Sequence, residues 1–156
     1  MLSALKKFFA QTSITESDSS EEHAAEQLLP AAAAMLLLEV AWADHNISDI
    51  EIAVIGSSLQ SLFELQEPFV SQLLEDSRQK HKTSVGVYEY TRTLNETLSE
   101  DEKYQLLVAL WRLALSDSDL HALEEHVIRR ISDLLYVPHT RFIAAKRKAR
   151  ALGSEP

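Results

Sequence analysis

The chain has 156 residues, of which 46% are apolar and 25% charged, so it is long and apolar enough for one domain with a buried core. It has no cysteine, which excludes disulfides, thiolate metal sites and thiol catalysis. Its formal net charge of −9 disfavours general binding to nucleic acid, because that binding requires a basic face. Its three glycines are too few for a glycine-rich phosphate loop.

The first 21 residues are predicted to lie outside the domain. Apolar residues in Leu2–Phe9 recur at helical spacing, and the acidic, serine-rich stretch Thr12–Glu22 is typical of a linker. The N-terminal apolar stretch is too short for a secretory signal. We therefore expect residues 1–21 to form an amphipathic segment and a flexible acidic linker, and residues 22–152 to form a helical domain.

The longest apolar run, Leu28–Ala43, is predicted to be a buried helix that extends from about residue 22 to residue 44. A membrane span needs about 20 apolar residues, whereas this run is shorter and is interrupted by Pro30 and Glu39. Pro30 either kinks this helix or marks its true first turn.

Local signals divide the rest of the chain into six further helices. These signals are capping-box spacings at Ser48/Glu51 and Ser99/Glu102, prolines suited to first turns at Pro68 and Pro138, and a capping serine at or near Ser84. The expected helices cover about residues 48–65, 68–78, 84–98, 99–116, 122–136 and 139–152. Because no segment alternates as a strand would, the predicted fold is all-α, a compact bundle of about seven helices.

An internal repeat appears when Met35–Leu62 is laid over Val108–Leu135, a shift of 73 positions. The matched pairs include Leu37/Leu110, Ala41/Ala114, Asp44/Asp117, Glu51/Glu124, Val54/Val127, Ile55/Ile128 and Leu62/Leu135. Apolar matches are common between helices, so the charged matches are what indicates a duplicated helix-loop-helix core. The first helix of each copy is apolar nearly all round. We therefore expect these two helices to pack together at the centre with approximate two-fold symmetry.

Glu39 and Arg112 occupy equivalent positions on these two apolar helices. An unpaired charge is costly to bury, so one hypothesis is that the two side chains form an ion pair near the pseudo-axis. The alternative is that each lies at a helix edge and reaches water.

The two loops between the repeated helices are the candidate site. Both have the form Asp, any residue, Asn or Asp, aliphatic, three residues, Glu, and the candidate ligands are Asp44, Asn46, Glu51, Asp117, Asp119 and Glu124. Oxygen ligands of this kind suit a divalent cation such as Ca²⁺ or Mg²⁺, and His45 and His121 would favour Mn²⁺ or Zn²⁺. Neither loop is an EF-hand, because both lack its glycine and its terminal glutamate.

A second interpretation of the same residues is structural. Asp and Asn shape loops by accepting hydrogen bonds from main-chain amides, and Glu51 and Glu124 complement the helix dipole from a first turn. Both interpretations remain open at the level of sequence.

These segments resemble a known family. Met35–Asp44 reads MLLLEVAWAD, and Leu110–Asp119 reads LWRLALSDSD and is followed by Glu124–Leu135; they are similar to the two repeats of the tellurite-resistance protein B (TerB)-like family. Val87–Asn95 resembles the segment between those repeats. The resemblance covers about residues 28–149.

The resemblance implies an all-helical, TerB-like fold, a bacterial cytoplasmic setting and a role linked to metal or oxyanion stress. Related domains fused to J-domain co-chaperones imply an adaptor role. The family's acidic positions fall on Asp44, Glu51, Asp117 and Glu124, but its usual glycine is replaced by His45 in one loop and Ser118 in the other.

Three further features have plain structural interpretations. The C-terminal helix carries a basic cluster and is expected to dock through Phe142 and Ile143 against the acidic remainder; the cluster is Arg141, Lys146, Arg147, Lys148 and Arg150. Trp42 and Trp111 are expected in the core because they lie on apolar helices.

The predicted function is a non-catalytic interaction or adaptor module in a stress response, with a protein partner and a divalent cation as an accompanying hypothesis. An enzyme is not expected, because no nucleophile or general base converges with the carboxylates. The alternatives are a metal-dependent enzyme that uses the acidic loops and a membrane-peripheral scaffold with weak surface contacts through its amphipathic ends. A homodimer is a further option, and nucleic acid is not expected.

Overall fold

The computed structural model describes residues 19–83, 86–116 and 122–154. Within these ranges every regular element is helical and seven α-helices are present, which confirms the all-α prediction. Their bounds are α2 Ser19–Ala41, α3 Asp49–Phe63, α4 Glu67–His81, α5 Tyr88–Thr97, α6 Glu100–Ala114, α7 Ala122–Leu134 and α8 His139–Ser154, and a short 3-10 helix, η1, follows α2 at Trp42–Asp44.

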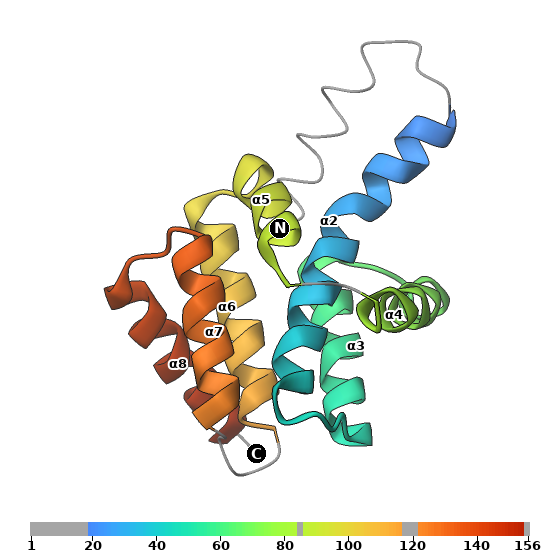
Figure 1. Cartoon of the computed structure of the whole chain (residues 1–156). Helices are drawn as coiled ribbons and strands as arrows, with labels where there is room; N and C mark the ends of the chain where they lie inside the picture. The colour runs from blue at the N-terminus through green and yellow to red at the C-terminus, as the bar shows by residue number, and fades with distance from the viewer. Residues whose placement is uncertain (1–18, 84–85, 117–121, 155–156) are drawn as a thin grey trace.

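Two central helices, α2 and α6, form the core. From Leu29 to Ala41 the side chains of α2 are buried except for Ala31 and Glu39, which are partly exposed, and ten residues of α6 are buried. The two helices pack against each other, as the sequence predicted, and they lie side by side in Figure 1. Each buried leucine stabilises the fold by about 1.5–3 kcal/mol, so this contact fixes the architecture.

The outer helices cover the centre in a crossed arrangement. α3 contacts both α2 and α6, and α7 contacts both α6 and α2. α4 then packs on α2, and α8 packs on α6. The first group therefore consists of α2, α3 and α4, the second group consists of α6, α7 and α8, and α5 lies between them. This is the contact pattern expected of two similar units around an approximate two-fold axis. The C-terminal ends of α2 and α6 lie at the same end of the bundle (Figure 1).

The two groups also end their second helix in the same way. α3 is followed by Glu64, and α7 is followed one residue later by Tyr136, each in the left-handed conformation with φ of 53° and 57°. A left-handed residue ends a helix because it turns the chain away from the helix axis. Pro68 and Pro138 then lie at the beginning of α4 and α8. This similarity extends past the repeated segments that the sequence comparison identified.

Both predicted capping boxes are present. Ser48 and Glu51 exchange hydrogen bonds of 3.1 Å between each side chain and the other's main-chain N–H. Ser99 and Glu102 do the same at 3.2 and 2.8 Å. These bonds satisfy amides that the first turn of a helix leaves without partners.

Of the two alternatives for Pro30, the structure supports the kink: Pro30 lies inside α2, and the first part of α2 is inclined to the rest (Figure 1). α5 begins at Tyr88 with no side-chain cap. The expected cap, Ser84, lies outside the described residues, as does the amphipathic segment Leu2–Phe9.

The C-terminal helix docks on α6 through one apolar face. Phe142, Ala145 and Ala149 are buried, and Ile143 packs partly against the core. The Phe142 ring contacts the indole of Trp111 with ring centroids 5.2 Å apart. Trp111 is fully buried, as expected. No helix in the described ranges is both long and apolar enough to cross a bilayer.

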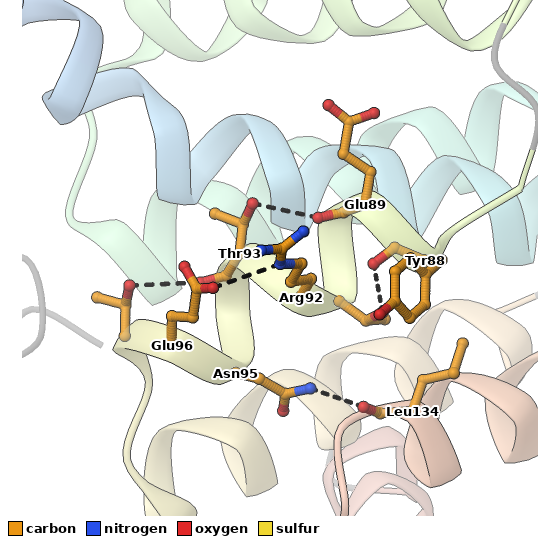
Figure 2. A network of polar contacts seen from close by, with 9 residues as sticks. Tyr88, Glu89, Arg92, Thr93, Asn95, Glu96 and Leu134 are labelled. Atoms are coloured by element: carbon orange, nitrogen blue, oxygen red, sulfur yellow. Dashed lines mark hydrogen bonds and ion pairs between the residues drawn. The ribbon is translucent and has the colours of Figure 1, made fainter.

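α5 packs on α7, and one side-chain amide bonds it to the end of that helix. Figure 2 shows Asn95 reaching from α5 to the main chain of Leu134, the last residue of α7. Its Nδ2 donates to the Leu134 carbonyl oxygen at 2.7 Å. A terminal helix carbonyl has no partner within its own helix, so this bond replaces the missing one. On the exposed face of α5, Arg92 and Glu96 form an ion pair of 3.5 Å.

Asn95→Ala is expected to lower the free energy of unfolding by about 1 kcal/mol, because it removes the donor to a helix-end carbonyl. Arg92→Ala on the same helix is the control and should cost less than about 0.5 kcal/mol, since its ion pair is exposed. Urea denaturation followed by circular dichroism measures both. Equal losses in the two variants would contradict this role of Asn95.

Candidate binding groove

The first acidic loop is shaped by its own main chain. After η1, His45 adopts the left-handed conformation with φ 62°, and its N–H donates to the Trp42 carbonyl oxygen at 2.8 Å. Asp44 Oδ1 accepts a hydrogen bond of 3.1 Å from the Asn46 N–H. This is the bond by which an aspartate stabilises a turn two residues ahead. The chain then enters α3 through the capping box of Ser48 and Glu51.

The structure explains how His45 can stand where the resemblance to the TerB-like family leads us to expect glycine. His45 occupies it and is left-handed, the conformation that glycine adopts without steric cost. Histidine is among the residues enriched there. Its ring also contacts the Trp42 ring edge to face, with centroids 5.6 Å apart. The substitution therefore preserves the turn.

The glutamates of the two loops are buried rather than open to solvent. Glu51 and Glu124 are each 2% exposed and hold the third helical position of α3 and α7. Glu51 Oε1 accepts the Ser48 N–H, so this carboxylate serves the helix N-terminus. Asp117 and Asp119 lie outside the described residues.

A cation site is therefore not assembled in the described part of the first loop. Asp44 and Glu51 each direct an oxygen to the main chain. Among the residues that the structure describes, no three histidine or carboxylate side chains are grouped to hold a metal ion. The loop-shaping interpretation accounts for the observed bonds, and a divalent cation stays a prediction for both loops.

The expected ion pair between Glu39 and Arg112 is not formed. Glu39 Oε2 instead lies 2.8 Å from His81 Nε2 of α4, and both side chains are partly buried. Arg112 is exposed. The reason is the crossed packing: Glu39 lies on the side of α2 that α4 covers, not on the side that packs against α6.

Beside this loop lies a groove of about 610 Å³, here called the Trp42 groove. Its walls come from the end of α2, the loop and the end of α4. The apolar side consists of Leu38, Trp42 and Ile47, and Asn46 and Gly86 lie at its edges. Trp42 is 42% exposed, so its predicted place in the core was wrong. η1 ends the apolar helix at this residue and turns it outward.

The opposite side of the Trp42 groove is basic. Arg78 and Lys82 are four residues apart and therefore lie on one face at the end of α4. Both are exposed, and neither forms an ion pair with a described residue. The one carboxylate in the described lining, Glu39, is hydrogen-bonded to His81. Positive charge at a helix C-terminus is also favourable to the helix.

Sequence reasoning did not identify Arg78, His81 and Lys82, because they stand in a polar stretch where the helix was expected to fade. Their spacing of three and four residues was the available signal. The face that they present depends on how α4 crosses α2, which the sequence pattern does not specify.

We expect Asp44→Asn to leave stability nearly unchanged, because an asparagine oxygen can accept the same amide, and Asp44→Ala to cost about 1 kcal/mol. Titration calorimetry with Ca²⁺, Mg²⁺, Mn²⁺ and Zn²⁺ tests the cation prediction separately, because a cation site in these loops requires binding tighter than about 1 mM. An ion bound more tightly by the native chain and lost in Asp44→Asn would establish the cation site and overturn the loop-shaping interpretation.

His45→Gly and His45→Val provide a second comparison. Both remove the ring contact with Trp42, but only valine is disfavoured at φ 62°. The valine variant is expected to be about 1–2 kcal/mol less stable than the glycine variant in urea denaturation. Equal stability would mean that the loop does not need the left-handed turn.

Comparisons with known proteins place this fold. The family model described as "Tellurite resistance protein TerB" matches residues 30–147. A search of curated proteins gives no match. The crystal structure of a protein of unknown function from Porphyromonas gingivalis W83 superposes with a TM-score of 0.59 at 21% identity, covering 80% of this chain and 95% of that one. That likeness shows the shared fold, and the family match shows that this chain belongs to the TerB family.

Proposed function

We propose that this chain is a non-catalytic binding module that holds a short segment of a partner protein in the Trp42 groove. The observation that carries the proposal is an exposed tryptophan in a concave site that is also lined by two cations, Arg78 and Lys82, neither of which is ion-paired with a described residue. The family description, which concerns tellurite resistance, supports a setting in a stress response.

The apolar side of the groove supports an anchored side chain of the partner. The accessible apolar surface comes from Trp42 and the partly buried Ile47, and Leu38, which also lines the groove, is fully buried. Tryptophan is enriched among the residues that dominate binding energies at protein interfaces. The loop beneath it is fixed by the bonds of Asp44 and Ser48, so little order has to be gained on binding.

The charges of the groove indicate the chemistry of the segment. Arg78 and Lys82 form a local basic edge on a chain of net charge −9. An acidic residue beside an apolar anchor would pair with this edge, whereas a basic segment would be repelled there. The proposed occupant is therefore a peptide segment with an aromatic or aliphatic anchor flanked by Asp or Glu.

The composition of the groove supports binding rather than catalysis. Its described lining holds no serine, threonine or cysteine that could act as a nucleophile. His81 is engaged by Glu39, and this pair joins α4 to α2. An imidazole held in this way positions the basic end of α4.

Selection of peptides from a random library on the native chain tests the proposal. Enriched peptides should combine an apolar anchor with acidic neighbours, and Trp42→Ala should weaken their binding at least about tenfold. Tyr88→Ala is the matched control, because Tyr88 is an exposed aromatic residue outside the groove. Selected peptides that bind Trp42→Ala as well as the native chain would refute the proposal.

The electrostatic part has its own test. Arg78→Gln with Lys82→Gln should weaken the selected peptides several-fold and flatten the dependence of affinity on salt. Lys80→Gln is the control: Lys80 lies on the same helix but contacts the Tyr90 ring instead. If Lys80→Gln lowered the affinity as much as the double variant does, general charge and not the groove edge would attract the peptides.

A further inference from the structure

A second depression, independent of the Trp42 groove, lies where α3, α6 and α8 meet. Its volume is about 260 Å³, and its described lining contains no aspartate or glutamate. Arg112 of α6 and Lys148 of α8 both line it. Two positive side chains thus converge at one place on a chain with 24 acidic and 15 basic residues.

Neither cation is neutralised within the described protein. Arg112 has no ion-pair partner, and Lys148 has none either. Two other basic residues of α8 are paired, Arg141 with Asp101 and Lys146 with Glu125, each at 3.2 Å, whereas Arg147 and Arg150 have no ion pair with a described residue and lie outside the depression. Carboxylates are therefore available to α8 elsewhere, and they are missing where Lys148 meets Arg112. Gathering like charges without a counter-ion is unfavourable unless an anion joins them.

A buried hydroxyl opens into the same depression. Ser58 is 5% exposed, lines the depression and makes no hydrogen bond to any residue in the described ranges. Its neighbour Ser57 instead donates to the Val54 carbonyl oxygen at 3.1 Å. Because the Ser58 hydroxyl forms no hydrogen bond with a described residue, it is available to a ligand or a water molecule in the depression.

The polar groups of the depression are suited to an acceptor. Arginine and lysine only donate hydrogen bonds, and the Ser58 and Tyr104 hydroxyls and the Gln105 amide can donate as well. A tetrahedral oxyanion such as phosphate is negatively charged and presents several acceptor oxygens, so it matches this set of donors and its positive charge. The volume lies slightly below the range of about 300–1,000 Å³ typical of drug-sized ligands.

We propose that this depression is a binding site for a small phosphate-type oxyanion, with Arg112 and Lys148 supplying charge and Ser58 the innermost donor. The assignment also explains Arg112. Arg112 interrupts the apolar stretch Leu106–Ala114 of α6 and has no ion-pair partner among the described residues, and in this proposal its partner is the bound anion.

Titration of the native chain with inorganic phosphate tests the site, with ionic strength held constant by sodium chloride. Amide resonances of Ser58, Arg112 and Lys148 should shift in a saturable way, with a Kd on the order of 1 mM. Shifts that rise linearly with phosphate, or that spread over all exposed basic residues, would mean non-specific association and would overturn the proposal.

Variants separate the site from general charge. Arg112→Gln and Lys148→Gln should each weaken phosphate binding at least about fivefold. Arg147→Gln is the matched control, because Arg147 is adjacent on α8, exposed and outside the depression. Equal weakening by Arg147→Gln would overturn the site.

Ser58→Ala gives a third readout that does not change the charge. It should weaken phosphate binding while leaving the unfolding midpoint in phosphate-free buffer unchanged, since the hydroxyl bonds to none of the described residues. Unchanged phosphate affinity in this variant would remove the buried donor from the site. Phosphate should also raise the unfolding temperature of the native chain more than that of Arg112→Gln.

Discussion

The apolar side chains of α2 and α6 bury one another, and the rest of the molecule is arranged by that contact. Each central helix is apolar on nearly every face, so neither can be stable at a surface. Two such helices need cover on all sides, which α3 and α7 provide by contacting both of them. α4, α5 and α8 close the remaining faces. The architecture thus follows from the need to cover two apolar helices with amphipathic ones.

The same constraint determines where charged groups can lie. Glu39 and Arg112 are charged residues within the apolar stretches Leu29–Ala41 of α2 and Leu106–Ala114 of α6, and each side chain lies toward an outer helix instead of meeting the other. Glu39 is hydrogen-bonded to His81 in the Trp42 groove, and Arg112 emerges beside Lys148. The two depressions of interest therefore lie on the flanks of the core, where central and outer helices separate.

Helix class, capping and the packing of α2 on α6 could be predicted from the sequence, because they depend on local chemistry and on apolar periodicity. The two capping boxes are examples: Ser48/Glu51 and Ser99/Glu102 have the required spacing and form the bonds. The candidate site was less predictable. The spacing of Asp44 and Glu51 identified both carboxylates as candidates, but only the folded structure shows which main-chain N–H groups donate hydrogen bonds to them.

The sequence did not predict how the helices cross and which side chains meet between them. The position of Trp42 at the surface depends on the 3-10 turn that ends α2, and the partner of Glu39 depends on how α4 crosses it. Repeat equivalence suggested that Glu39 would face Arg112, yet equivalent positions about a two-fold axis meet only when they point at the axis. Here both point away from it, toward different outer helices.

Native-state hydrogen exchange tests the mutual burial of α2 and α6 most directly. The amides of residues 33–41 and 106–114 are expected to be the slowest to exchange. Both groups should exchange with the same free energy, equal to that of global unfolding, because neither helix can lose its partner alone. Exchange of the α2 amides at a free energy lower than that of α6 by more than about 2 kcal/mol would show that the halves open independently, and would contradict it.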